Sequence, residues 1–112
     1  MLMSSAFYSE DLKGDWNGTL DVPGAQLRIV FHVTKTDNGY KATMDSPDQN
    51  VSGIPVTTTD FTYPNVKFQI SNLGVVYEGT LADDRITGKW MQSGQTFPLI
   101  MSKKEVLPKE KE

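Results

Sequence analysis

The sequence predicts an all-β protein, an antiparallel, eight-stranded, up-and-down barrel that is closed or nearly closed. Between residues 14 and 103 apolar and polar residues alternate with a period of two, and turn-forming residues recur about every ten positions. No segment has a convincing helical period. The chain has 112 residues, which suits one domain with one modest core. We place this domain at residues 13–103, between an N-terminal segment (1–12) and a charged tail or linker (104–112).

Eight runs of alternating residues are the expected strands, and they lie at 14–20, 27–35, 40–45, 51–59, 66–71, 75–82, 85–92 and 95–102. In the second run, for example, Leu27, Ile29, Phe31 and Val33 share one face, and polar residues alternate with them. One buried face and one solvated face per strand are what a closed antiparallel sheet requires.

Turn residues predict which strand residues lie opposite each other. Asn38-Gly39 and Ser93-Gly94 suit tight hairpins, and residues 82–85 form a short link. The expected pairs are Val33 with Met44, Trp90 with Phe97, Tyr77 with Trp90, Gly79 with Gly88, and Leu81 with Ile86. All of these pairs belong to the inward set, so turn chemistry and periodicity agree.

Three inward positions are glycines, which normally weaken a strand. Gly18, Gly79 and Gly88 each stand two residues from an aromatic residue of the same face. We expect them to make room for Trp16, Tyr77 and Trp90, and to let the strands coil enough to close the barrel.

The two ends of the chain are less regular. The segment 1–12 is either the remnant of a secretory signal without its basic start, or an amphipathic segment with a short helical turn at 4–12. The segment 104–112 alternates charges around a proline, as solvated tails and linkers do. No apolar run reaches the roughly 18–20 residues that cross a bilayer.

Composition argues against several function classes. With 11 basic and 14 acidic side chains the net charge is −3, which argues against a nucleic-acid binder. There is no cysteine, and the one histidine, His32, falls on the outer face, which argues against zinc sites and serine–histidine catalysis. Asp45 and Asp48 flank Ser46-Pro47, a pattern that favours a turn over a calcium loop or an acid–base pair. We expect no catalytic residue, metal or cofactor.

In an up-and-down barrel, alternate loops gather at the same end. One end then collects residues 21–26, 46–50, 72–74 and 92–94, and Trp16 lies near the other end. Eight strands enclose either a filled core or one small ligand, and the bulky inward residues favour the filled core. We expect the first end to bind a ligand or partner through Asp48, Gln49, Tyr77, Trp90, Gln92 and Phe97.

Five segments in this order resemble a known module: residues 14–20 (Gly-Asp-Trp-Asn-Gly-Thr-Leu), 27–33, 45–49 (Asp-Ser-Pro-Asp-Gln), 77–81 (Tyr-Glu-Gly-Thr-Leu) and 86–92. It is the small β domain found ahead of the catalytic domain in many secreted bacterial serine hydrolases of the α/β-hydrolase type. The resemblance spans residues 12–103, and the Ser-Pro-Asp-Gln segment is its most specific element. More loosely, Gly14-x-Trp16 is similar to the start of lipocalin and avidin-like barrels.

The resemblance implies a non-catalytic accessory domain of a periplasmic or secreted hydrolase. Its partner would be the neighbouring hydrolase domain, which carries the catalytic residues. The alternative is a stand-alone, lipocalin-like carrier of a small apolar ligand. We expect a monomer, or a weak dimer where an exposed edge strand pairs.

Overall fold

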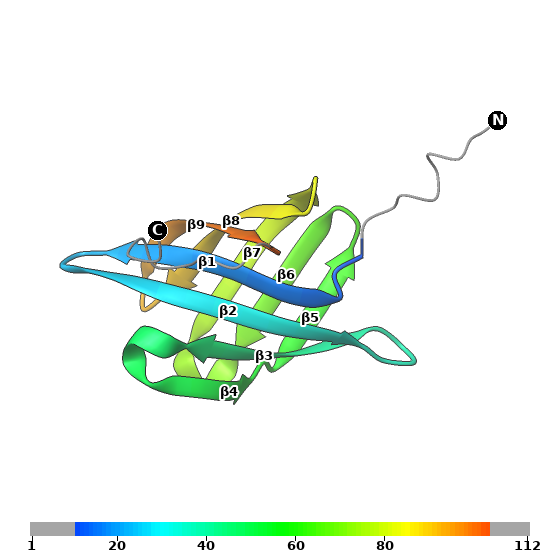
Figure 1. Ribbon diagram of the computed structural model, residues 1–112, viewed down its shortest axis with the longest axis horizontal. Coiled ribbons are helices and arrows are strands. Elements are labelled where there is room, and N and C mark those ends of the chain that lie inside the picture. The colour runs from blue at the N-terminus through cyan, green and yellow to red at the C-terminus, as the bar shows by residue number, and fades with distance from the viewer. Residues whose placement is uncertain (1–10, 104–112) are drawn as a thin grey trace, which may run out of the picture.

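The computed structural model describes residues 11–103 of the chain. One antiparallel sheet forms the whole fold of this part. Figure 1 shows the sheet rolled around its own inner face. The nine strands in the described part are β1 (Gly14–Val22), β2 (Ala25–Lys35), β3 (Tyr40–Ser46), β4 (Val51–Pro55), β5 (Thr58–Thr62), β6 (Asn65–Ile70), β7 (Val75–Ala82), β8 (Arg85–Gln92) and β9 (Gln95–Ser102). Two short 3-10 turns, η2 (Pro47–Gln49) and η3 (Ser71–Leu73), interrupt them.

The all-β, antiparallel, up-and-down arrangement is confirmed, but the expected closure is wrong. The strand order is β4-β3-β2-β1-β9-β8-β7-β6-β5, so β4 and β5 are the two edges of the sheet. The first and last strands meet in its middle, where Asn17 of β1 lies opposite Ser102 of β9. The result is an open half-barrel.

The expected eight strands are nine, because the run at 51–59 is divided. Its first part, β4, pairs with β3, and its second part, β5, pairs with β6. The backbone N–H of Val56 still donates to Ala42 on β3 (3.0 Å), and the next N–H, of Thr57, donates to Gln69 on β6 (2.7 Å). The change of partner thus falls between Val56 and Thr57, one residue after Pro55, which itself has no N–H to donate. The same change leaves β4 and β5 unpaired with each other.

Four of the five expected pairs are observed, and one is wrong by two residues. The pairs Trp90–Phe97, Tyr77–Trp90, Gly79–Gly88 and Leu81–Ile86 form as expected. Val33 instead lies opposite Ala42, and Met44 opposite Phe31. The connection between β2 and β3 has four residues, closed by a hydrogen bond from the N–H of Thr36 to Gly39, and not the two of a tight turn. A shift of two residues keeps every side chain on its expected face.

The core holds the inward residues that alternation predicts, from all parts of the sheet. Its largest fully buried side chains include Trp16, Phe31, Phe68 and Tyr77. Leu12, from the expected N-terminal segment, is also buried, and its carbonyl accepts the Trp16 indole N–H at 2.7 Å. The expected helical turn at 4–12 falls largely, and the tail at 104–112 entirely, outside the described residues.

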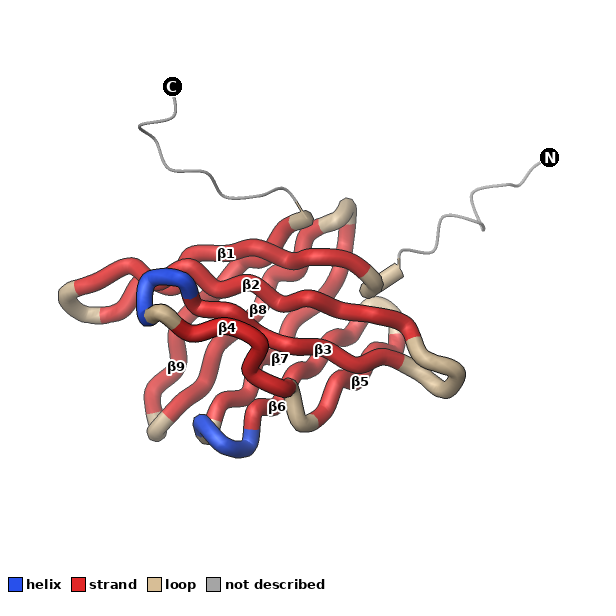
Figure 2. Tube along the Cα trace, turned by 60° about the horizontal axis from the view of Figure 1, so that its bottom comes forward, coloured by secondary structure: helices blue, strands red, loops and turns tan. Residues whose placement is uncertain are grey.

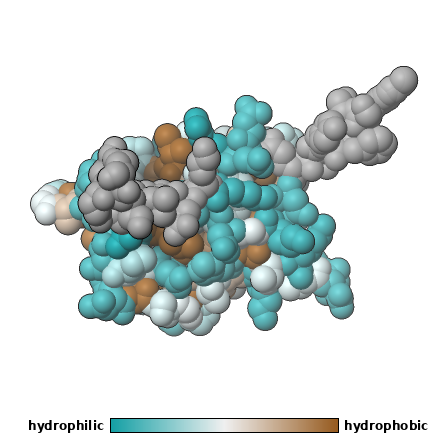
Figure 3. Space-filling model, in the orientation of Figure 1, coloured by the Kyte–Doolittle hydropathy of each residue, from teal (hydrophilic) through white to brown (hydrophobic). Residues whose placement is uncertain are grey.

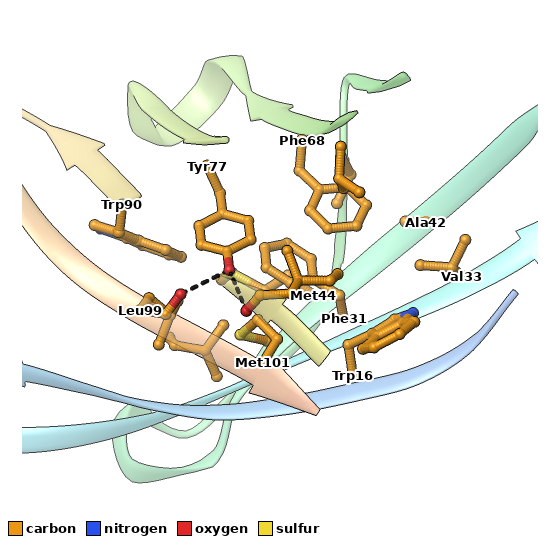
Figure 4. Close-up of a cluster of buried hydrophobic side chains, with 14 of the residues drawn as sticks. Trp16, Phe31, Val33, Ala42, Met44, Phe68, Tyr77, Trp90, Leu99 and Met101 are labelled. Atoms are coloured by element: carbon orange, nitrogen blue, oxygen red, sulfur yellow. Dashed lines mark hydrogen bonds between the residues drawn. The ribbon is translucent and has the colours of Figure 1, made fainter. Parts of the chain in front are cut away.

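The sheet has two halves, β1–β4 and β5–β9, which meet where β1 pairs with β9. A stack of aromatic rings joins these two halves inside the core (Figure 4). The rings of Phe31 (β2) and Phe68 (β6) are 4.2 Å apart between centroids and inclined by 20°. Tyr77 extends the stack from β7 at 6.2 Å from Phe68. Its hydroxyl donates to the carbonyl of Leu99 at 2.7 Å, and burial raises the pKa of this hydroxyl. Outside the stack, Tyr40 and Phe61 meet edge to face, 5.7 Å apart, between β3 and β5.

The inward glycines allow neighbouring backbones to approach each other, and do not mainly make room for aromatic rings. A Cβ atom on Gly18 would lie 2.6 Å from the carbonyl oxygen of Ile100, and one on Gly79 would lie 2.7 Å from that of Thr87. On Gly88 it would overlap the carbonyl of Glu78. These carbonyls belong to the backbone of neighbouring strands, so they cannot shift without moving the strand itself. The barrel closure that these glycines were expected to allow is not observed, because the sheet stays open between β4 and β5.

Replacing Gly18 or Gly88 with Ala should therefore lower the free energy of unfolding by about 1–3 kcal/mol, the usual cost of overpacking. Gly39→Ala is the matched control, because a Cβ there meets nothing within 4 Å. It should change stability by less than about 0.5 kcal/mol. Urea unfolding of the three variants measures the difference, and equal stabilities would contradict the close-approach explanation.

Candidate functional site

The two ends of the half-barrel differ in how they are filled. One end contains Trp16 and the edge-to-face pair described above. The other end, which we call the mouth, carries the β1–β2 hairpin, both 3-10 turns and the Ser93-Gly94 turn (Figure 2). Each 3-10 turn ends in a left-handed residue, Asn50 with φ 57° and Gly74 with φ 66°, which turns the chain back into the next strand.

An apolar pocket of about 200 Å³ lies at the mouth. Its walls come from both halves of the sheet and from both 3-10 turns. Most of its lining residues are apolar: Leu20, Val22, Leu27, Ile29, Met44, Val51, Ile54, Leu73, Trp90 and Phe97. The polar ones are Ser46, Gln49 and Gln92, all uncharged. A concave apolar surface with a few polar groups at its rim is the usual form of a small-molecule site.

Four of the six residues expected at a binding end line this pocket, namely Gln49, Trp90, Gln92 and Phe97. Tyr77 does not line it, because its ring lies deeper, in the aromatic stack. Asp48 does not line it either, because its carboxylate faces β2. Strand parity predicts correctly that Tyr77 and Trp90 share one face of the sheet. It does not predict how far each ring lies from the mouth.

Gln92 connects the tryptophan of the pocket to the rim. The indole N–H of Trp90 donates to the side-chain oxygen of Gln92 at 3.2 Å. The side-chain N–H of Gln92 donates in turn to the carbonyl of Leu73 in η3 at 3.1 Å. Trp90 is only 4% exposed, so its indole N–H needs such a partner. The side chain of Gln92 therefore holds one wall and one rim turn in a fixed relation.

Asp48 fixes the opposite rim turn. Beyond the pair Val30–Asp45 the strand β3 gives way to η2, and the Asp48 carboxylate accepts the backbone N–H of Arg28 at 2.8 Å. The Arg28 side chain donates to both carboxylate oxygens, at 3.2 and 2.9 Å. These side-chain and backbone hydrogen bonds lower the pKa of Asp48. Asp48 therefore holds the segment that carries Gln49 and does not itself line the pocket.

Ser46 was not among the expected site residues, yet it is the one buried polar residue of the described core. Its hydroxyl donates to the side-chain oxygen of Gln49 at 2.8 Å, which brings both groups to the pocket rim. Ile54 and Leu73 were also missed. Inward alternation could have identified Ile54. Loop parity placed residues 72–74 at this end, but no local pattern shows that η3 turns Leu73 over the pocket.

Two larger but more open hollows lie away from the mouth. One, of about 250 Å³, lies over β5, β6 and β7, and the other, of about 460 Å³, lies beside the β7–β8 turn; both are lined mostly by polar and charged residues. The face seen in Figure 3 is mostly hydrophilic, with isolated hydrophobic residues. Among residues 11–103 the exposed large hydrophobic side chains are Tyr63, Leu73 and Ile100, and of these Leu73 lines the pocket.

His32 lies on the outer face, as expected, between two carboxylates. Its Nδ1 is 2.8 Å from Asp15 Oδ1 on β1, and its Nε2 is 2.7 Å from Asp45 Oδ2 on β3. The hydrogen bonds to Asp15 and then Asp45 raise the pKa of His32 above its ordinary 6.5. For Asp45, partial burial raises the pKa, but the Gly53 N–H and His32 outweigh it, so the pKa lies below 3.8.

Within the described part of the chain, no three His, Cys, Asp or Glu residues are grouped to hold a metal ion. No helix there is long and apolar enough to span a membrane. Comparison with models of known families, with characterised proteins and with solved structures finds no match to this chain.

The pH dependence of stability should reveal the charged state of His32. Its folded pKa is raised, so protonated His32 stabilises the fold fully below pH 6.5, and this contribution is lost as pH rises through the folded pKa. Near pH 5.5 the unaltered protein should therefore be more stable than the His32→Gln variant. The difference in the free energy of unfolding should be less than about 1 kcal/mol, because the ion pairs are partly exposed, and it should disappear by pH 8.5.

Urea unfolding at both pH values measures this difference. Thr34→Gln, on the same face of β2, is the control for an outer-face substitution. If the difference in the free energy of unfolding between the unaltered protein and His32→Gln is the same at both pH values, the ion-paired state is contradicted.

Proposed function

We propose that this chain is a binding module whose mouth pocket takes a small apolar group, with no chemistry of its own. The observation that carries the proposal is the pocket itself, apolar on its walls and uncharged at its rim. Hydrogen bonds hold both rim turns in place, through Asp48 on one side and Gln92 on the other. A site that is formed before binding loses little free energy to ordering.

The volume indicates the size of the bound group. Ligand pockets for drug-sized molecules have about 300–1,000 Å³, whereas a dry cavity of about 150 Å³ holds benzene. A pocket of about 200 Å³ lies between these cases. It suits one aromatic ring, a short acyl or alkyl chain, or one apolar side chain of a partner.

The environment of the single histidine supports a non-enzymatic function. A serine nucleophile needs a base within hydrogen-bonding distance, and histidine is the usual one. Both ring nitrogens of His32 already contact carboxylates, and the side chain lies on the outer face, away from the pocket.

A second candidate function concerns the same pocket. The Ser-Pro-Asp-Gln segment, the most specific part of the resemblance to hydrolase accessory domains, forms η2 and so one side of the pocket rim. This location favours a role in which a neighbouring periplasmic or secreted hydrolase domain inserts an apolar side chain into the mouth. The lipocalin-like carrier and the accessory domain thus differ in the occupant, not in the site.

Titration with toluene, which has one aromatic ring, tests the proposal. The NMR signal of the Trp90 indole N–H should shift saturably, with a dissociation constant of about 0.1–1 mM for so small a ligand. The Trp16 indole lies at the other end of the core and should not move. Ile54→Trp should fill the pocket and weaken binding at least tenfold.

Ile100→Trp is the matched control, because Ile100 is 53% exposed on the outer face and should leave binding unchanged. A Trp90 signal that does not respond to toluene, or responds equally in both variants, would contradict the proposal. The Trp90 signal also tests the second candidate function. If adding a serine hydrolase domain shifts this signal, and the Ile54→Trp variant does not respond, the occupant is a side chain of that domain.

A further inference from the structure

We infer that the mouth pocket selects an uncharged amphiphile, which is a short hydrocarbon group carrying a hydroxyl, ester or amide at its outer end. This inference rests on the proposed function and adds to it the chemical class of the ligand. It follows from the lining of the pocket, from the ion pair beside the rim, and from the hydrogen-bonding groups that the rim presents.

The lining contains no ionisable side chain. The walls are hydrocarbon and aromatic, and the polar groups are one hydroxyl, on Ser46, and two amides, on Gln49 and Gln92. A charged head group brought to such a surface would lose part of its hydration without meeting an opposite charge, which is unfavourable.

The ion pair beside η2 engages both of its charges with each other. Arg28 and Asp48 form a two-point ion pair, and the Asp48 carboxylate also accepts the Arg28 backbone N–H. To pair with a ligand carboxylate, the guanidinium would have to leave Asp48 and release η2. The ion pair thus shapes the rim without offering a net charge to a ligand.

The rim can instead bind a neutral oxygen. The Gln49 side-chain oxygen accepts the Ser46 hydroxyl, which ties this exposed side chain to the rim. The Gln49 NH2 group has no hydrogen-bond acceptor among residues 11–103, so it can donate to a hydroxyl, ester or amide oxygen. Gln92 is already bonded to Trp90 and Leu73, so Gln49 is the main contact for the head group.

Three ligands with the same six-carbon tail test the inference at pH 7: 1-hexanol, hexanoate and hexylammonium. The shift of the Trp90 indole N–H signal reports binding, and the Trp16 indole signal is the internal reference. We expect hexanol to bind at least fivefold more tightly than either ion. A smaller preference would overturn the inference while leaving the proposed function intact.

The failure of the proposed function would look different, because then neither toluene nor any of the three ligands would shift the Trp90 signal. That result would overturn both statements. Saturable toluene binding together with equal binding of hexanol and hexanoate overturns the head-group inference alone.

Variants of Gln49 show whether the preference comes from the rim or only from the hydrophobicity of the ligand. Gln49→Lys should lower the dissociation constant of hexanoate at least threefold and should not strengthen hexylammonium binding. Gln49→Met, of similar length but without an amide, should weaken hexanol binding and leave toluene binding unchanged. Unchanged hexanol and hexanoate binding in both variants would overturn the assignment of Gln49 to the head group.

Discussion

The stacking of Phe31 on Phe68 is the interaction on which the shape of this protein depends. The two rings come from β2 and β6, which are separated by four strands in the sheet order. No backbone ladder joins β4 to β5, so the two halves of the sheet face each other only through side chains and the short link between these strands. Because no hydrogen bonds join the edge strands β4 and β5, the burial of these aromatic rings holds the two halves together.

The position of the stack explains why one end is filled and the other is hollow. Away from the mouth, the Tyr40–Phe61 pair fills the space between the halves, and Trp16 is buried on β1 directly opposite Phe31 of β2. On the mouth side of the stack lie the two 3-10 turns, and the pocket remains between these turns and the strands. Polar side chains hold these turns from outside and from the rim, so the pocket does not depend on a ligand for its walls. Several wall residues, among them Ile29, Met44 and Trp90, also belong to the buried core, so the pocket is continuous with the core.

Much of this could be predicted from local chemistry, and the remainder depends on contacts between distant residues. Alternation identified the inward faces, and the turns at 82–85 and 93–94 fixed the pairing of β7, β8 and β9. The division at Pro55 was missed, because a strand that changes partners keeps its alternation. The depth of Tyr77, and the approach of Leu73 to Trp90, depend on how the sheet rolls. The role of Asp48 depends on Arg28, twenty residues earlier.

A double-mutant cycle on the stacked pair tests the central claim most directly. Phe31→Leu, Phe68→Leu and the double variant would be compared with the unaltered protein by equilibrium urea unfolding. If the two rings hold the halves together, the losses should not be additive, and the coupling free energy should be about 1 kcal/mol. A coupling of less than about 0.3 kcal/mol, as for distant independent sites, would contradict the account.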